Sequence, residues 1–543
     1  MTLVPMPATG KIAVFILSIL SGKLIIDEKM AKFHWLLALV AFLILSAAFQ
    51  FSTSNVVDLD SFFYMRLGAL YRDAGIFNVD FPWIAPSVIK EFSSSLWYGF
   101  GILLIPFTPF PDLSLGIKAA GFIFTAIFLF LFYLVLRGRD IKWAAFWPFL
   151  LFFAAPNTTA HFLMTRPQTV SLILAAPLFF FVSRRLPLGI LLTSFGIAWV
   201  HMNFSWLPLL VTGVFVVWKL ILEQKFAWKK ILWSLAGVAI AIFSRPNPIG
   251  AIKLFYTQVF QQILEKQGGL PLLFGIENVP IGSAALFTHF GAFMFLWLMA
   301  IALWVYFLAK RNKADSGGYW QNNDVFVSAA MTLSVVFFIL TAVVARRAYD
   351  FWVLFGIIGI AVVFTYICLN FRKSSQADIA KIAVGAIFIF MVFYSGYRTL
   401  NNLQKSYAAD YLKEPAAWLK EHSNPGDVVF NAHWSNFSPL FAWNQKNYYT
   451  GGLDPIFQYQ YSPSLYWKFH YLSTDQVTKK TCGAIACTVS MLEDTYEVLK
   501  RDFSAKYALL QKKENPAVNQ YMGADQRFEK VFENNSEVIY LIK

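Results

Sequence analysis

The chain alternates apolar runs with short polar connections over most of its length. The first run long enough to cross a bilayer is 33–51. Since a spanning helix takes about 20 apolar residues, the pattern predicts a polytopic membrane protein of about eleven spans. A shorter run among lysines, 12–20, predicts an interfacial or partly inserted helix. The later spans are predicted at 119–136, 143–156, 169–182, 188–200, 207–222, 231–243, 286–308, 325–344, 351–369 and 382–394.

Lysine and arginine clusters between the runs predict which side each connection faces. The run 93–109 is apolar and bounded by proline, but if it crossed, the basic cluster at 137–142 would face outside. We therefore expect 93–109 to be a re-entrant or surface helix. With that choice most basic clusters lie on the inner side, and the segments 52–118 and 244–285 become external loops of a membrane domain covering 1–397.

The remainder of the chain, 398–543, has a different composition. Pro, Asn, Asp, Lys and Tyr occur throughout it, and the alternating segments 428–431 and 537–542 are typical of strands. The sequence therefore predicts a mostly α-helical membrane protein that carries a soluble mixed α/β domain at its C-terminal end, on the outer side.

Composition agrees with this class. The chain is 57% hydrophobic and 18% aromatic with a mean hydropathy of +0.54, which excludes a soluble protein. A net charge of +14 would suggest nucleic acid in a soluble protein, but here the basic residues flank apolar runs, so we expect contact with membrane lipid and none with nucleic acid. Cys482 and Cys487 in the tail are either a small disulfide loop or two thiols, and the sequence leaves both open.

Candidate chemistry begins directly after the first span. Asp58 and Asp60 lie one residue apart beside aromatic residues, an arrangement suited to a divalent cation at a membrane surface. Arg166, Arg245 and the pair Arg346–Arg347 lie at predicted external ends of spans, against the positive-inside rule. A phosphate bound by guanidinium would explain them. The alternatives are pairing with local acids, such as Arg346 with Asp350, or a topology wrong by one span.

Two segments carry a resemblance to a known family. Asp58 to Arg66 resembles the first external loop of the GT-C glycosyltransferases, in particular the oligosaccharyltransferase catalytic subunit. Gly275 to Pro280 resembles the segment of that family whose glutamate, here Glu277, helps to organise metal and acceptor. The resemblance implies that Asp60 is a general base or metal ligand, that Asp58 and Glu277 support it, and that Mg or Mn is bound by Asp60 and Glu277. More loosely, Arg346 to Phe351 resembles the arginine-containing entry to a late helix of the same family, which implies that Arg346 or Arg347 holds donor phosphate. Arg166, at an external end against the positive-inside rule, is a further candidate for a phosphate contact.

The chain also departs from the family. The loop 157–168 lacks the acidic pair expected there, so either His161 substitutes or catalysis needs no metal. Trp434 aligns with the family motif W-W-D-Y-G, but Ser435 replaces its aspartate, which removes the group that recognises an Asn-X-Ser/Thr acceptor. His161, Trp434, Tyr449 and Asp454 are the candidates for acceptor or sugar binding. Tyr449, Asp454 and the aromatic residues that follow are expected to form either a sugar-stacking platform or an aromatic core. His201 and Asn203 follow Trp199 in a Trp-x-His pattern similar to that of some bacterial GT-C proteins.

These observations predict a membrane glycosyltransferase. It would move a sugar or oligosaccharide from a polyprenyl-(pyro)phosphate donor to a protein, lipid or glycan acceptor at the outer face of a membrane. Compact loops suggest a bacterial inner membrane with the tail in the periplasm. The alternatives are a GT-C-fold scaffold without activity and a lipid or polysaccharide transporter, although few ionisable residues lie within the predicted spans.

Overall fold

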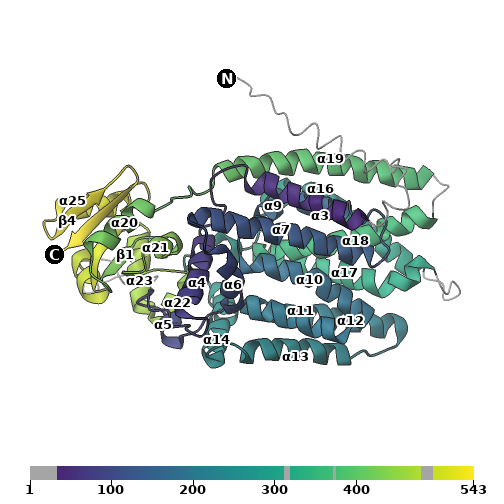
Figure 1. Ribbon diagram of the computed structural model, residues 1–543, viewed down its shortest axis with the longest axis horizontal. Helices are drawn as coiled ribbons and strands as arrows, with labels where there is room; N and C mark the ends of the chain where they lie inside the picture. Colours follow the sequence, from purple (N-terminus) through teal and green to yellow (C-terminus); the bar gives the residue numbers. More distant parts are fainter. Residues whose placement is uncertain (1–32, 311–317, 371–374, 478–492) are drawn as a thin grey trace, which may run out of the picture.

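The computed structural model describes residues 33–310, 318–370, 375–477 and 493–543, with the side chains of 375–377 left aside. The predicted helix at 12–20 and the Cys482–Cys487 pair lie outside the described residues. Within them, a long bundle of helices carries a small sheet domain at one end (Figure 1).

The bundle consists of apolar helices that run along its length (Figure 1). In the described ranges, 7 helices are long and apolar enough to cross a membrane, or 8 if one bent pair counts as a span. These helices and two shorter ones coincide with predicted spans, which confirms the predicted polytopic membrane fold. The long helices are α7 (Leu113–Arg137), α10 (Pro167–Arg184), α12 (Leu207–Glu223), α16 (Ser283–Ala309), α17 (Tyr319–Val343), α18 (Tyr349–Asn370) and α19 (Ser375–Gln404), and the shorter ones are α3 (His34–Gln50) and α11 (Pro187–Val200).

The span predicted at 143–156 is not one helix. It is divided into α8 (Trp147–Phe152) and α9 (Pro156–Phe162), because proline lacks the N–H that a continuing helix needs and favours a helix start instead. The segment leaves the end of α7 and returns to its start, where Thr165 Oγ1 donates a hydrogen bond of 2.7 Å to the carbonyl of Ile117. The chain therefore passes along the bundle here as a broken helix.

Several short helices lie between the bundle and the sheet domain (Figure 1). They include α4 (Asp60–Ala74), α5 (Val88–Phe92) and α6 (Tyr98–Leu104) with the adjoining 3-10 turn η1 (Ile105–Phe107). Because α6 and η1 are together too short to cross a bilayer, the run 93–109 forms a surface or re-entrant segment in this structure.

The predicted external loop at 244–285 is helical over much of its first half. After α13 (Lys229–Phe243) the chain bends by 113° into a continuous helical stretch, Pro248–Gln267. This stretch contains α14 (Pro248–Phe255), the π-helical turn η3 (Tyr256–Gln261) and α15 (Gln262–Gln267). Only the part after Gln267 is a loop, interrupted by the 3-10 turn η4 (Ile276–Asn278).

The sheet domain follows α19, which continues to Gln404. Its five strands have the order β2-β1-β3-β5-β4. β1 pairs in parallel with β2 and β3, whereas β5 pairs antiparallel with β3 and β4. The strands predicted at 428–431 and 537–542 are β1 and β5. The described elements are α20 (Lys413–His422), β1 (Val428–Asn431), η6 (Trp434–Asn436), α21 (Phe437–Trp443), β2 (Tyr448–Tyr449), α22 (Pro455–Tyr461), α23 (Pro463–Ser473), α24 (Thr495–Glu497), η8 (Val498–Asp502), β3 (Ala505–Gln511), α25 (Pro516–Ala524), β4 (Phe528–Glu533) and β5 (Glu537–Ile542).

Candidate active site

A polar pocket lies where the bundle meets the sheet domain. It holds about 590 Å³, part of it open to solvent. Its walls come from α4, the start of α10, the connection before α16, the 3-10 turn η5 (Arg346–Ala348) and the sheet domain. The lining residues are Asp60, Tyr64, Trp97, Arg166, Pro167, Gln168, His201, Asn203, Gln258, Glu277, Arg347, Trp434, Leu453 and Asp454. Six of the predicted site residues are among them: Asp60, Arg166, Glu277, Arg347, Trp434 and Asp454.

Helix α4 brings Asp60 to this pocket. Asp60 is the first residue of the helix, where the positive end of the helix dipole favours a carboxylate. The other face of α4 is buried in aromatic packing: the ring of Phe63 lies 5.7 Å from Trp97 and 6.0 Å from Phe441. Since these contacts tie α4 to the start of α6 and to α21, they fix the position of its first residue.

Arg166 joins the two neighbouring acids. Its Nε donates to Asp58 Oδ2 at 2.7 Å, and its Nη2 donates to Asp58 Oδ1 and to Asp60 Oδ2, the latter at 2.9 Å. Such a bidentate pair is strong and directional. Ser438 of α21 donates to Asp60 Oδ1 at 3.2 Å, so both oxygens of Asp60 have a partner. The guanidinium of Arg166 is therefore already used by protein carboxylates, which weighs against its predicted role as a phosphate contact.

The acids of the pocket differ in charge. Burial raises the pKa of Asp60 to about 7, against the opposing effect of Arg166. The side chain keeps 28% of its surface exposed, and this surface faces the pocket. Burial also acts to raise the pKa of Glu277, but the positive charges of Arg347 and Arg166 outweigh this effect, so the pKa of Glu277 is lowered. Asp60 is thus the group that can exchange a proton near neutral pH, while Glu277 stays ionised.

The two adjacent arginines have different positions. Arg347 lines the pocket, where its Nη2 lies 3.3 Å from Glu277 Oε1. Arg346 lies outside the pocket wall, and its Nη2 reaches the carbonyl of Pro280 at 3.4 Å. The Nε atoms of both are buried without a hydrogen-bond partner among the described residues. Buried donors of this kind are normally satisfied, so the pair is suited to an anionic ligand.

Arg245, the remaining arginine that broke the positive-inside rule, has a structural role. Its guanidinium is buried and donates to the carbonyls of Ala198 at 2.8 Å and Ser95 at 3.1 Å. These bonds hold the end of α13 against the end of α11.

A chain of amides forms another wall of the pocket. Asn203 donates to Gln258 Oε1 at 2.7 Å, and Gln258 donates to Asp454 Oδ2 at 2.9 Å. Burial raises the pKa of Asp454 above its ordinary value, although the hydrogen bond from Gln258 acts in the opposite direction. Asp454 is therefore held in place by η3, and it presents a hydrogen-bonding group to the pocket beside Trp434.

His161 lies behind the pocket rather than in its wall. Its Nδ1 is 2.9 Å from Asp350 Oδ2, and its Nε2 is 2.9 Å from the hydroxyl of Tyr349. Gln168, which lines the pocket, donates to the same Asp350 oxygen at 2.5 Å. The alternative pairing of Arg346 with Asp350 is thus not formed, and the predicted contact of His161 with acceptor is not supported by its position.

The prediction of Tyr449 as a sugar-binding residue is wrong. Its side chain is fully buried in the sheet domain, where its hydroxyl donates to the carbonyl of Asn444 at 3.1 Å. Phe457 and Tyr466 are also fully buried. These aromatic residues form a core, which was the alternative left open by the sequence, whereas Trp434 reaches the pocket.

The sequence did not single out three polar residues of the pocket: Tyr64, Gln168 and Gln258. Tyr64 follows Asp60 by one helical turn, so the helical spacing of 58–66 would have placed it beside the acid. Gln168 and Gln258 carry amides that no motif marked, and apart from the nearness of Gln168 to Arg166 no feature of the sequence pointed to them.

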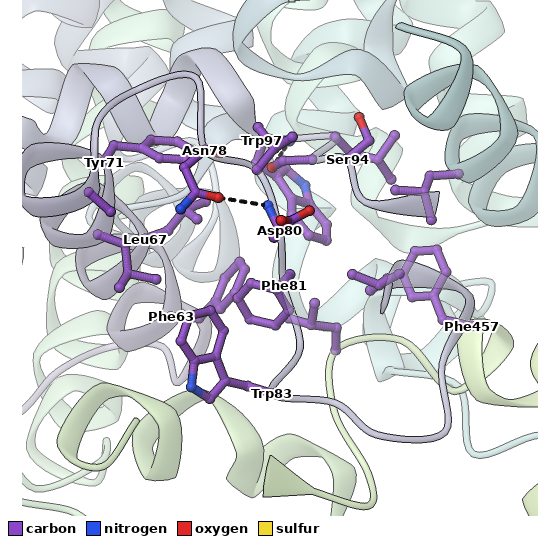
Figure 2. A pocket seen from close by; sticks show the side chains of 18 residues that line it. Phe63, Leu67, Tyr71, Asn78, Asp80, Phe81, Trp83, Ser94, Trp97 and Phe457 are labelled. Atoms are coloured by element: carbon purple, nitrogen blue, oxygen red, sulfur yellow. Dashed lines mark hydrogen bonds between the residues drawn. The ribbon is translucent and has the colours of Figure 1, made fainter. Parts of the chain in front are cut away.

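A second, mainly apolar cavity adjoins the pocket and shares Trp97 and Leu453 with it. Figure 2 shows the rings of Phe63, Phe81 and Trp83 on one side of this cavity and Asp80 near its middle. The backbone N–H of Asp80 donates to Asn78 Oδ1 at 3.3 Å. The cavity offers packing surface next to the charged pocket but no second cluster of charges.

The residues present do not form a ligand set for a divalent metal. In the described part of the chain no group of three or more His, Cys, Asp or Glu side chains is placed to hold one. The guanidinium of Arg166 also takes the position between Asp58 and Asp60 that a cation would need. Binding of Mg or Mn by Asp60 and Glu277 therefore stays a prediction, and no step below depends on it.

Together, fold and pocket define an integral membrane protein whose charged pocket is covered by an α/β domain. No family model matches the chain, and no curated protein matches it in sequence. Among solved structures it is similar to ArnT from Cupriavidus metallidurans, solved bound to undecaprenyl phosphate, with 12% identity and a TM-score of 0.49 over 94% of this chain and 98% of that one. Identity this low assigns neither a family nor a ligand.

Proposed function

We propose that the protein is a membrane glycosyltransferase of the GT-C class. It would transfer a sugar or oligosaccharide from a polyprenyl-(pyro)phosphate donor to an acceptor at the outer face of the membrane. The observation that carries the proposal is that Asp60, Glu277 and Arg347, predicted from separate segments, line one pocket at the end of the membrane bundle.

The arginine pair supports a donor phosphate. Arg347 points into the pocket, its contact with Glu277 is long at 3.3 Å, and the buried Nε atoms of Arg346 and Arg347 have no partner among the described residues. A phosphate or pyrophosphate in the pocket would accept hydrogen bonds from the guanidinium of Arg347, which lines it, and would be stabilised as a leaving group. Arg166 contributes indirectly, because it keeps Asp58 and Asp60 together.

Asp60 is suited to act as general base. A pKa of about 7 makes its carboxylate a stronger base than an ordinary aspartate while much of it is still ionised at neutral pH. In the proposed step Asp60 accepts the proton of the acceptor O–H or N–H, and the acceptor atom forms a bond to the anomeric carbon. The bond between that carbon and the phosphate oxygen breaks, and the phosphate leaves with the electron pair.

The distribution of charge supports an external pocket. α10 begins at the pocket and ends at Arg184, and α12 likewise ends near Lys225, Lys229 and Lys230. Basic residues therefore gather at the bundle end away from the pocket, which the positive-inside rule assigns to the inner face. At the outer face a lipid-linked donor is the expected source of sugar, since nucleotide sugars stay inside the cell.

The test is sugar transfer by an Asp60→Asn variant. Membranes containing the protein are supplied with radiolabelled polyprenyl-phosphate sugars, and release of label from the lipid and its appearance in acceptor are measured. We expect the variant to lose at least 100-fold in rate, in line with the ~10²–10⁴-fold contribution of a general base, while unfolding at the same temperature as the wild type.

Asp80→Asn is the matched control. It removes a carboxylate from the neighbouring apolar cavity, and we expect it to keep activity. Full activity of Asp60→Asn would contradict the proposal. A wild-type protein that releases no label from any polyprenyl donor would favour a scaffold without catalytic activity.

A further inference from the structure

A strongly basic cavity lies at the opposite end of the bundle from the pocket. It is located at the connection between α12 and α13, far from the sheet domain in Figure 1. It holds about 870 Å³, part of it open to solvent. Three parts of the chain supply its cations: Arg185 after α10, Lys219 in α12, and Lys225, Lys229 and Lys230 around the start of α13.

These cations are only partly balanced by acids. No aspartate or glutamate is among the residues that line the cavity within the described ranges. Lys219 pairs with Glu223 one turn further along α12, and Lys230 donates to the carbonyl of Val182. Mutual repulsion of cations makes such a cluster unfavourable unless an anion joins it.

Three of the cations are available for a ligand. Arg185, Lys225 and Lys229 are exposed, and in the part of the chain that the structure describes none of their side chains has a hydrogen-bond or ion-pair partner. Arg185 ends α10 in the left-handed conformation, with φ of 59°, and its side chain lines the cavity. Guanidinium and ammonium groups from separate elements thus converge on one space.

The rim of the cavity is apolar. Phe226, Trp228 and Trp233 line it and are 61%, 48% and 43% exposed. Exposed leucines, Leu188 and Leu192 of α11, continue the apolar surface along the bundle. Tryptophan beside lysine is typical of the level where lipid headgroups meet hydrocarbon, so the cavity opens toward lipid as well as water.

We propose that this cavity binds the phosphate headgroup of an anionic phospholipid, with the acyl chains along the apolar faces of α11 and α13. A free phosphate ion shares the same chemistry, but it would leave the exposed tryptophans and leucines without contacts. The headgroup would neutralise Arg185, Lys225 and Lys229 and would hold the α12–α13 connection at the membrane surface. This site is independent of the sugar-transfer chemistry at the other end.

The test counts bound lipids by native mass spectrometry. The full chain is purified in neutral detergent, stripped of lipid, and titrated with dioleoylphosphatidylglycerol or dioleoylphosphatidylcholine. We expect one phosphatidylglycerol to bind about tenfold or more tightly than phosphatidylcholine, given the attraction of each basic residue near an anionic lipid. The triple variant Arg185→Gln, Lys225→Gln, Lys229→Gln is expected to lose this preference.

The matched control removes equal charge elsewhere at the same end of the bundle. This control is the triple variant Arg137→Gln, Lys142→Gln, Lys310→Gln. Its substitutions lie outside the cavity, so it should keep the preference for phosphatidylglycerol. The proposal is overturned if the control variant loses it equally, if the two lipids bind alike, or if inorganic phosphate displaces the bound phosphatidylglycerol. Should the triple variant fail to fold, the exposed single variants Lys225→Gln and Lys229→Gln must each reduce the preference.

Discussion

Asp60 controls the charge of the pocket, because its pKa of about 7 lies within the physiological range. Its base form is the ionised one, so activity should be lost as pH falls below this pKa. We expect kcat/KM to fall about tenfold per pH unit below pH 7 and to level off above it. Since Arg166 stabilises the ionised form, Arg166→Gln should move the midpoint of the pH profile upward by about one unit.

A pH profile with no inflection between about pH 6 and 8 would contradict the role of Asp60 as base. A change in folding alone cannot imitate the expected shift, because it would lower activity at all pH values. Arg72→Gln, on the exposed side of the same helix, is the control and should leave the midpoint where it is.

Arg347 is expected to act on the donor rather than on the acceptor. Removal of its contact to a phosphate should cost about 1.5–3 kcal/mol, or roughly 10–100-fold in kcat/KM, as for hydrogen bonds to charged groups. Kinetics with varied lipid donor should show the loss in Arg347→Gln and a partial recovery in Arg347→Lys. If only the dependence on acceptor concentration changes, the assignment of Arg347 to donor phosphate is wrong.

Metal removal tests the unconfirmed ligand role of Asp60 and Glu277. Because Arg166 already bridges Asp58 and Asp60, we expect transfer to persist after treatment with EDTA and to respond little to added Mg or Mn. The measurement is initial rate in EDTA and after metal is restored. A complete loss that Mn or Mg reverses would show that a cation enters the pocket and that the carboxylates rearrange around it.

The sequence predicted the charged residues of the pocket better than its neutral ones. Asp60 and Glu277 could be found because each lies in a segment that resembles the family, in a chain that has few charged residues. Gln258 could not, since an amide has no motif and acquires its role only by reaching Asp454, 196 positions away. Tyr449 was misjudged because an aromatic run has the same pattern whether it faces a ligand or a core.

At the scale of elements, the apolar runs located the helices but not their continuity. The run 143–156 is apolar because α8 is packed inside the protein, where Trp147, Leu150 and Leu151 are fully buried, and not because one helix spans lipid there. The segment 244–285 was predicted as an external loop because it separates two apolar runs, and Gln258 and Gln262 within it are polar. They belong to a helical stretch whose amides face Asp454, a partner in a distant part of the sequence.

The packing of α13 on α11 depends on a glycine. A Cβ added to Gly237 would lie 2.4 Å from the carbonyl of Leu191 and 2.9 Å from Ser194 Cβ. Because the backbone of α11 cannot move aside without a large cost in free energy, Gly237→Ala should destabilise the bundle by about 1–3 kcal/mol through overpacking. Thermal unfolding of the purified protein, followed by tryptophan fluorescence, measures the effect.

Gly213→Ala is the matched control in the neighbouring helix α12, where an added Cβ meets no atom within 4 Å. There the substitution should be neutral or stabilising by about 0.5–1 kcal/mol, because alanine favours helix. Equal behaviour of the two variants would contradict the close contact between α11 and α13.

At the scale of the whole molecule, the proposed chemistry requires the sheet domain and the pocket to face outward while the basic cavity faces inward. Accessibility of single cysteines tests this arrangement, in a background where Cys368, Cys482 and Cys487 are serine. A cysteine at Glu529, exposed in β4, should react with a membrane-impermeant maleimide in intact cells. One at Lys310, at the far end of α16, should react only after the membrane is opened. The reverse result would place the pocket where nucleotide sugars are available, and the argument for a lipid-linked donor would fail even though the residues of the pocket are unchanged.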